Sequence, residues 1–199
     1  TLDRSSAASD VYKRQDEDGG FKKGEMREMA DAIEAAADQN RLRSDHLLHL
    51  RCEVASADVL EHFEDFETDP RVRLISLMDH SPGQRQFQSM DQYIFYYQKK
   101  RGLSDEAFAE FVRRRQAASA EYSAKHRDYL AARCAERGIT VASHDDATEA
   151  HVGEAIGHGV KLAEFPTSVE AAKASHSAGM SVLMGAPNIC LLYTSDAAD

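Results

Sequence analysis

Cysteine and long apolar runs are scarce in this chain of 199 residues, and each shortage excludes a class of protein. The three cysteines, Cys52, Cys134 and Cys190, lie far apart, are odd in number and show no CxxC spacing. A disulfide framework or a zinc ribbon is therefore not expected, and a reducing compartment fits better. No apolar run is long enough to span a membrane, and the N-terminus lacks the apolar core of a signal peptide. We therefore predict a cytoplasmic protein with no membrane partner.

Basic side chains are also in short supply, because 24 Lys and Arg residues stand against 34 Asp and Glu residues, a formal net charge of −10. General binding to nucleic acid needs a basic surface, so no nucleic-acid partner is expected. A phosphate-rich substrate would have to meet bound cations or a local group of arginines. The chain contains nothing like a GxGxxG or Walker loop either, which weakens the case for a nucleotide-binding sheet.

Five short apolar runs are present instead, and long amphipathic stretches separate them. The runs span residues 47–53, 74–80, 139–146, 160–166 and 181–188. A first helix followed by alternating strands and helices predicts an α/β fold with a parallel sheet and right-handed crossovers. Five such strands can form an open doubly wound sheet or most of a closed barrel.

Helix signals lie between the apolar runs. Apolar residues at helical spacing predict a helix over about residues 23–39. Ser104 can cap a long helical pattern that Gly138 ends, which is either one long helix or two with a soft joint. Two later helices begin at segments that resemble capping boxes, at residues 146–149 and 167–170.

Two further stretches carry less defined signals. Residues 84–100, with an aromatic cluster, resemble an excursion over the site, and the arginines at 113–115 are most simply an exposed helix face. Residues 1–15 show no clear period and are predicted to be a tail.

Polar residues stand at the carboxyl ends of the apolar runs, where α/β barrels and open α/β sheets keep their active sites. Because side chains alternate along a strand, His49, Arg51 and Glu53 share one face of the first run. A parallel strand that is buried on both faces should be apolar throughout. This polar face therefore fits either a barrel interior that opens into a site or an edge strand with one wet face, and spacing alone does not choose.

Two histidines end the next two runs, and one of them precedes two aspartates. Either His80 or His144 alone is more often a structural hydrogen-bonding residue than a metal ligand, and Asp146 could simply cap its helix. A carboxylate and two histidines at three strand ends are more informative, because such groups bind hard or borderline divalent cations and leave positions open for water. Such a cation would lower the pKa of bound water and supply a hydroxide nucleophile at neutral pH.

Other residues near the strand ends have two readings each. Arg85 follows a Pro-Gly turn and could hold an anion or be a solvated loop cation. Glu164 and Asn188 could face the site or serve the turns in which they lie, and turn chemistry is preferred for Asn188. Cys52 is expected to pack against the outer face of its strand.

Four segments of the chain resemble one family closely. They are residues 74–87 (LISLMDHSPGQRQF), 142–148 (ASHDDAT), 163–167 (AEFPT) and 182–189 (VLMGAPNI). The family is the phosphonate-pathway diphosphatases of the amidohydrolase superfamily, which act with the carbon–phosphorus lyase system. The resemblance implies a metal-dependent TIM (β/α)8 barrel that hydrolyses α-D-ribose 1-methylphosphonate 5-triphosphate to the 5-phosphate and pyrophosphate.

The resemblance also implies roles for individual residues. Its metal ligands, for one or two ions of zinc, manganese or a similar divalent metal, would be Glu53, His80 and His144. Asp145 and Asp146 are assigned to catalysis. The residues assigned to the triphosphorylated sugar phosphonate are Arg51, Arg85, His49 and Asn188. Metal ions and guanidinium groups would reconcile this anionic substrate with the acidic chain.

Parts of the family pattern are missing. A first barrel strand with a His-x-Asp motif is expected upstream of residue 16, and a last strand with a metal-site aspartate downstream of residue 189. We therefore predict a partial barrel over residues 16–189, foreign-looking tails at 1–15 and 190–199, and little or no activity of the chain itself. The alternatives are another amidohydrolase, such as an N-acyl-sugar deacetylase or a cyclic-amide hydrolase, and a catalytically silent α/β binding module. A homo-oligomer is also compatible with the sequence.

Overall fold

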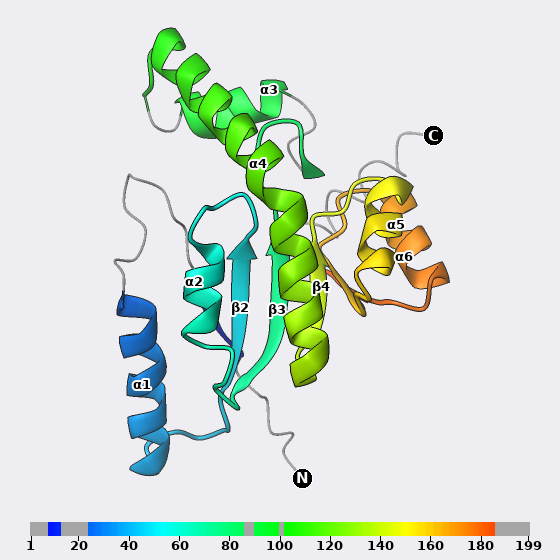
Figure 1. Cartoon of the computed structure of the whole chain (residues 1–199). Coiled ribbons are helices and arrows are strands. Elements are labelled where there is room, and N and C mark those ends of the chain that lie inside the picture. The colour runs from blue at the N-terminus through cyan, green and yellow to red at the C-terminus, as the bar shows by residue number, and fades with distance from the viewer. Residues whose placement is uncertain (1–7, 13–23, 86–89, 100–101, 186–199) are drawn as a thin grey trace.

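The predicted parallel α/β arrangement is confirmed. The computed structural model describes residues 8–12, 24–85, 90–99 and 102–185, and these contain six parallel strands in one sheet (Figure 1). In order along both the chain and the sheet, the strands are β1 (Ala8–Tyr12), β2 (Leu47–Glu53), β3 (Val72–Met78), β4 (Thr140–His144), β5 (Leu162–Glu164) and β6 (Ser181–Leu183).

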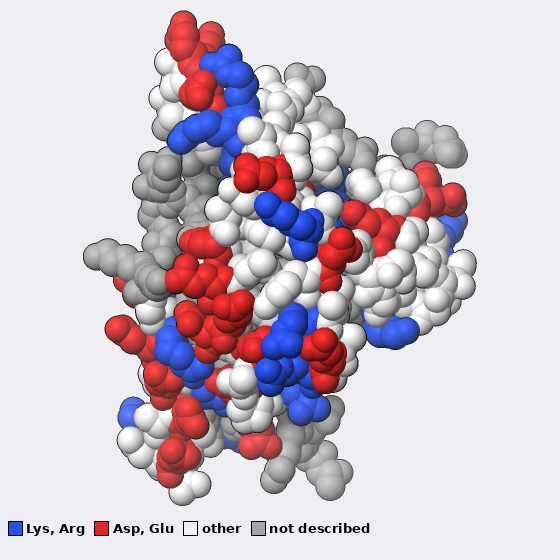
Figure 2. Space-filling view, viewed as in Figure 1, with Lys and Arg blue, Asp and Glu red and all other residues white. Residues whose placement is uncertain are grey.

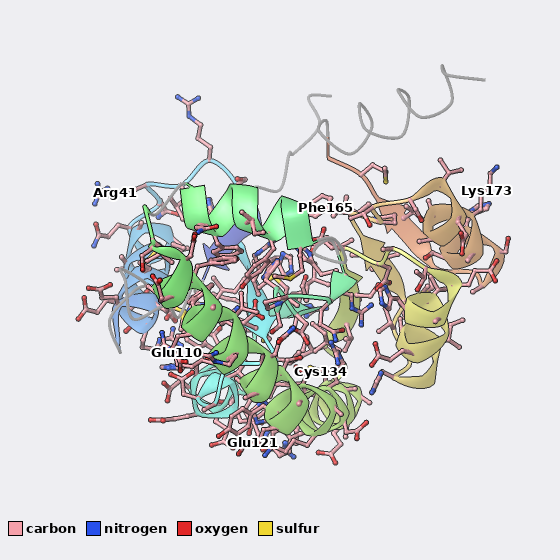
Figure 3. All side chains as sticks on the ribbon, turned by 90° about the horizontal axis from the view of Figure 1, so that it is seen from above. Arg41, Glu110, Glu121, Cys134, Phe165 and Lys173 are labelled. Atoms are coloured by element: carbon pink, nitrogen blue, oxygen red, sulfur yellow. The ribbon has the colours of Figure 1, made fainter. Side chains whose placement is uncertain are left out.

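Helices connect the strands, and several of them pack against the sheet. They are α1 (Glu25–Asp38), α2 (Val59–Glu64), α3 (Met90–Tyr93), the π-helix η2 (Ile94–Lys99), α4 (Asp105–Arg137), α5 (Glu149–Gly157) and α6 (Val169–Ser177). Viewed along the strands from their carboxyl ends, α1 lies at one side of the molecule and α5 and α6 at the other (Figure 3). Helices α2 and α4 contact each other, and each also packs on the sheet, so they cover the same face.

The strand order distinguishes between the two predicted architectures. A doubly wound sheet reverses its order at a switch point and carries helices on both faces. Here the order β1 to β6 runs without reversal, as consecutive strands of a barrel do. The sheet is therefore compatible with part of a barrel.

The structure differs from the prediction at residues 8–12, which lie within the predicted tail. They form β1 and pair in parallel with β2, from Ala8 opposite Leu47 to Tyr12 opposite Arg51. Strand pairing uses backbone N–H and C=O groups, which every non-proline residue carries, so it can occur without a side-chain pattern. This pairing also makes β2 an interior strand.

The two faces of β2 have the predicted difference in character. Leu48, Leu50 and Cys52 belong to the main hydrophobic core, which lies between the sheet and the helices. On the opposite face His49 is buried, with a relative exposure of 5%. Because β2 has neighbours on both sides, its polar face does not belong to an edge strand.

Helix α4 confirms the predicted long helix. It runs unbroken for 33 residues; the Ser104 hydroxyl accepts a hydrogen bond from the Ala107 amide at its start, and Gly138, with a φ of 68°, ends it. Its N-terminal part extends beyond the carboxyl ends of the strands, where α3 lies against it (Figure 1). There Tyr93, Tyr97 and Phe108 form a second core. We call α3, η2 and this part of α4 the arm; it corresponds to the predicted excursion.

The two short helices begin slightly later than their capping boxes predicted. Thr148 is the N-cap of α5 and accepts a hydrogen bond from the His151 amide, and Ser168 is the N-cap of α6. Asp146 is therefore not the cap of its helix.

The surface mixes both signs of charge. On the face in Figure 2, Lys and Arg side chains are interspersed with Asp and Glu over most of the visible helices. In the part of the chain that the structure describes, no helix has both the length and the apolar character needed to cross a bilayer.

Candidate metal centre

Four strand ends bring titratable side chains to one edge of the sheet. Glu53, His144 and Glu164 are the last residues of β2, β4 and β5, and His80 follows β3 by two residues. Since the strands are parallel, their carboxyl ends meet at this edge, below the arm (Figure 1). All four side chains are largely shielded from solvent.

Glu53 fixes the orientation of His80. Its Oε2 lies 2.6 Å from His80 Nδ1, and its Oε1 accepts a hydrogen bond of 3.0 Å from the His80 backbone amide. With Nδ1 engaged, His80 Nε2 faces the other way and lies 3.8 Å from Oδ2 of Asp145. The Arg115 guanidinium of α4 lies 3.8 Å from Glu53 Oε1 and neutralises part of its charge.

Glu164 plays the same part for His144. Its Oε2 lies 2.6 Å from His144 Nδ1, and His144 Nε2 lies 3.3 Å from Asp145 Oδ2. Nη2 of Arg51 also hydrogen-bonds His144 Nε2, at 3.3 Å. A guanidinium can only donate, so Nε2 accepts and, in a neutral ring, Nδ1 carries the proton that is donated to Glu164.

Three ligand atoms therefore converge. One ligand atom from each of His80, His144 and Asp145 lies within 4.8 Å of the other two. The two imidazole rings meet edge to face, with centroids 5.6 Å apart. Asp145 reaches this position through a left-handed backbone, with a φ of 55°, which aspartate tolerates better than most residues. Such local strain is common at functional sites.

Burial and charge shift the pKa values of this cluster. Burial would raise the pKa of Glu53, but the charge and hydrogen bond of His80, together with Arg115, hold it below its ordinary value. Burial also opposes ionisation of Glu164, yet the His144 hydrogen bond lowers its pKa to about 2. Asp145 differs, because burial raises its pKa despite the nearby histidines. The two carboxylates behind the histidines are thus held ionised.

The observed group differs from the predicted ligand set in one residue. His80 and His144 come together as expected, but the carboxylate between their Nε2 atoms belongs to Asp145, which we assigned to catalysis. Glu53 lies behind His80, on the Nδ1 side. Sequence position alone could not separate a carboxylate that faces the ion from one that orients a ligand, because both follow strand ends.

Arg85 and Asp146 pair with each other. The Arg85 guanidinium is buried between Asp146 and Glu154, at 2.5 Å from Glu154 Oε2, and its relative exposure is 4%. A cation that two carboxylates already hold is less available to a substrate, and the assignment of Arg85 to substrate binding stays a prediction. Asp146 forms the other half of this buried pair, and its assignment to catalysis stays a prediction. Its backbone carbonyl accepts from the Thr167 amide, which ties the two loops together.

The remaining predicted substrate residues have different positions. Arg51 lies at the cluster, as described above. His49 lies deeper along β2, where its Nε2 is 2.6 Å from Ser76 Oγ, so its burial argues against the predicted contact with substrate. Asn188 lies outside the described residues.

Two residues of the site were missed by sequence reasoning. Arg115 belongs to the arginine run that we predicted to be exposed, but it is only 19% exposed and reaches Glu53. Asp79 is buried and accepts hydrogen bonds from Ser119 and Ser123 of α4 at 2.9 and 2.8 Å. These hydrogen bonds, with one from the Ser81 amide, lower the Asp79 pKa against the effect of burial. No local signal marks Arg115, whereas Asp79 could have been noticed because it interrupts the end of an apolar run.

Comparison with known proteins gives one close relative. No family model and no solved structure matches the chain. Over 172 residues the chain is 46% identical to the alpha-D-ribose 1-methylphosphonate 5-triphosphate diphosphatase of Escherichia coli (strain K12). The matched region covers 86% of this chain and 46% of the relative. The chain thus spans about half the length of that enzyme. The predicted resemblance to the phosphonate-pathway diphosphatases is thereby confirmed, and this chain is homologous to nearly half of one of them.

Proposed function

We propose that this chain is part of a metal-dependent diphosphatase that hydrolyses α-D-ribose 1-methylphosphonate 5-triphosphate to the 5-phosphate and pyrophosphate. The substrate follows from the name of the 46% identical relative. Metal dependence is carried by one observation, the convergence of His80, His144 and Asp145 at the carboxyl edge of the sheet. The unreversed strand order supports a further part of the proposal, an amidohydrolase TIM barrel.

The residues present fit a divalent cation. Two imidazole nitrogens and one carboxylate suit zinc, manganese or a similar ion, and three protein ligands leave a position for water or substrate. Metal-binding histidines almost always donate their second ring N–H to an acceptor, which fixes the tautomer. Both histidines here have a carboxylate 2.6 Å from Nδ1. We therefore assign His80, His144 and Asp145 as ligands, and Glu53 as the residue that orients His80.

A divalent cation at this site would lower the pKa of a bound water toward neutrality and offset charge on phosphate oxygens. The chain's own residues supply the rest. Arg51 Nη2 lies 3.3 Å from His144 Nε2, and its Nη1 lies 3.7 Å from Glu164. A cation on Nε2 would free Nη2 of Arg51 to bind a phosphate oxygen beside the histidines. Asp145, between the two histidines, is placed to accept the proton of the attacking water. The anhydride bond then breaks and pyrophosphate leaves.

Metal binding by the chain itself tests the site. We expect calorimetry to show that the chain binds zinc, and that His80→Ala or His144→Ala removes this binding. His158→Ala is the matched control, because His158 pairs with Asp128 on the surface, away from the cluster. Equal zinc affinity in all four proteins would contradict the proposed site.

Substrate specificity needs a complete enzyme. We expect a chimera, in which this chain replaces the matching segment of the Escherichia coli relative, to release pyrophosphate from the triphosphate and to leave an N-acyl sugar intact. The isolated chain should show little or no turnover. A folded chimera that removes the acyl group and spares the triphosphate would overturn the proposal in favour of a deacetylase.

A further inference from the structure

A row of four buried side chains crosses the sheet beneath the metal centre. His49 Nε2 lies 2.6 Å from Ser76 Oγ, and the Ser76 hydroxyl donates to Glu164 Oε2 at 2.7 Å. Glu164 Oε2 in turn lies 2.6 Å from His144 Nδ1. The relative exposures of His49, Ser76, Glu164 and His144 are 5%, 0%, 3% and 4%. The row takes one residue from each of β2, β3, β5 and β4.

The direction of each hydrogen bond follows from chemistry. Ser76 has one hydroxyl proton and gives it to Glu164, so the bond between His49 and Ser76 must be donated by His49 Nε2. On the other side, Arg51 donates to His144 Nε2, which leaves the Nδ1 proton for Glu164. Every proton in the row therefore points toward the Glu164 carboxylate.

A buried row of polar side chains costs more free energy than apolar side chains in the same position would. Buried polar groups cost free energy unless every one is satisfied, and apolar side chains of similar volume would pack there without that requirement. The opposite face of β2 consists of apolar packing residues, such as Leu48 and Leu50. The polar face thus needs a reason beyond packing, and its end point, His144, supplies one.

We propose that Ser76 and His49 are positioning residues for His144. This inference rests on the proposed role of His144 as a metal ligand. Ser76 holds the Glu164 carboxylate from the side opposite His144, and His49 holds the Ser76 hydroxyl in the orientation that donates. Glu164 then keeps His144 in the Nδ1–H tautomer, with the Nε2 lone pair directed to the metal centre. This gives His49 a task other than contact with substrate.

The test removes one hydroxyl and compares two matched serines. Ser76→Ala deletes the donor to Glu164. Ser143→Ala is the control, because Ser143 is also buried and directly precedes His144, yet its hydroxyl has no hydrogen-bond partner among the described residues. Ser76→Thr keeps the hydroxyl and should restore the wild-type behaviour. Ser76→Cys retains a weaker donor, and it replaces Ser76→Ala if that variant does not fold.

Two readouts are needed. In the metal-free, ¹⁵N-histidine-labelled chain, we expect NMR to show His144 as a single Nδ1–H tautomer whose proton signal is displaced by a short hydrogen bond. Ser76→Ala should weaken or shift this signal, whereas Ser143→Ala should leave it in place. In calorimetry, Ser76→Ala should weaken zinc binding about tenfold, the lower end of what a hydrogen bond to a charged group contributes.

The outcomes separate this inference from the proposed function. If Ser76→Ala, or Ser76→Cys in its place, matches Ser143→Ala in both the His144 spectrum and the zinc affinity, the positioning role is overturned. If the wild-type chain fails to bind zinc, the metal centre is wrong. In that case the His144 spectrum of the metal-free chain still decides whether Ser76 holds the tautomer.

Discussion

The two histidines of the proposed metal centre each have Nδ1 next to a carboxylate, but their carboxylates are supported differently. His144 is held from the sheet, by Glu164 and the buried hydroxyl of Ser76. His80 lies on a loop, and its partner Glu53 is tied to Arg115 of α4. The side chains of His80 and Glu53 are 14% and 11% exposed, whereas those of His144 and Glu164 are 5% and 3% exposed.

The two histidines thus show two ways in which a protein can fix the Nδ1–H tautomer of a histidine. On the His144 side, strand register sets the geometry, because each member of the row occupies a fixed position in the sheet. On the His80 side, the loop after β3 must first be fastened, and Asp79 and Arg85 fasten it to α4 and α5. We therefore expect the orientation of His144 to be lost when its hydrogen-bonded row is broken. The orientation of His80 should be lost when the loop after β3 is released.

The largest effect should come from breaking the fastening of the His80 loop. Arg85→Ala leaves the buried Asp146 carboxylate without its cation, and breaking a buried ion pair costs about 3 kcal/mol or more. Chemical denaturation should show this loss of unfolding free energy. Arg113→Ala, which removes an exposed pair with Glu110, should change the unfolding free energy by less than about 1 kcal/mol. Similar losses in the two variants would show that Arg85 does not hold the loop.

The next effect compares the two carboxylates directly. Partners of metal-ligating histidines typically change metal affinity about 10- to 100-fold. We expect Glu164→Gln to weaken zinc binding near the upper end and Glu53→Gln near the lower end, because Glu164 is more deeply buried. Zinc titration by calorimetry measures both. Were Glu53→Gln to abolish binding as completely as His80→Ala, Glu53 would be a ligand, as the sequence predicted.

Acid should destabilise the metal-free chain by protonating Glu164, the partner of His144. The pKa of Glu164 in the folded chain, about 2, lies below the ordinary value of about 4.3 in an unfolded chain. Its ionised form therefore stabilises the fold above about pH 4, and this contribution is lost as the pH falls toward 2. Glu164→Gln should flatten this part of the stability curve, measured by denaturation at each pH. An unchanged slope would mean that Glu164 does not account for it.

The smallest effect should come from the link between Glu53 and α4. Arg115 lies 3.8 Å from Glu53 and is partly exposed, so the pair is weak. Arg115→Gln should weaken zinc binding only about threefold, a fraction of 1 kcal/mol. Arg133→Gln, remote from the cluster and paired with Glu67, is the control for loss of an α4 cation. A loss in Arg115→Gln as large as that in Glu53→Gln would make α4 a principal support of His80.

Much of this arrangement could be predicted from local sequence. Apolar runs and capping signals predicted the parallel sheet and the long helix, and His80 and His144 were found because they end two of the runs. The roles of Asp145 and Arg85 could not be predicted. The first depends on a left-handed turn after β4, and the second on an ion pair between positions 61 residues apart. Strand β1 was missed because backbone pairing leaves no side-chain signature.

Helix α4 joins two parts of the molecule that otherwise have separate cores. At 33 residues it is about 50 Å long, given a rise of about 1.5 Å per residue. One end packs in the aromatic core of the arm, and the middle carries the serines that hold Asp79, the residue next to His80. A displacement of the arm would thus be transmitted through the continuous helix α4 to the loop that carries His80. His144, which is held by residues of the sheet, would stay in place.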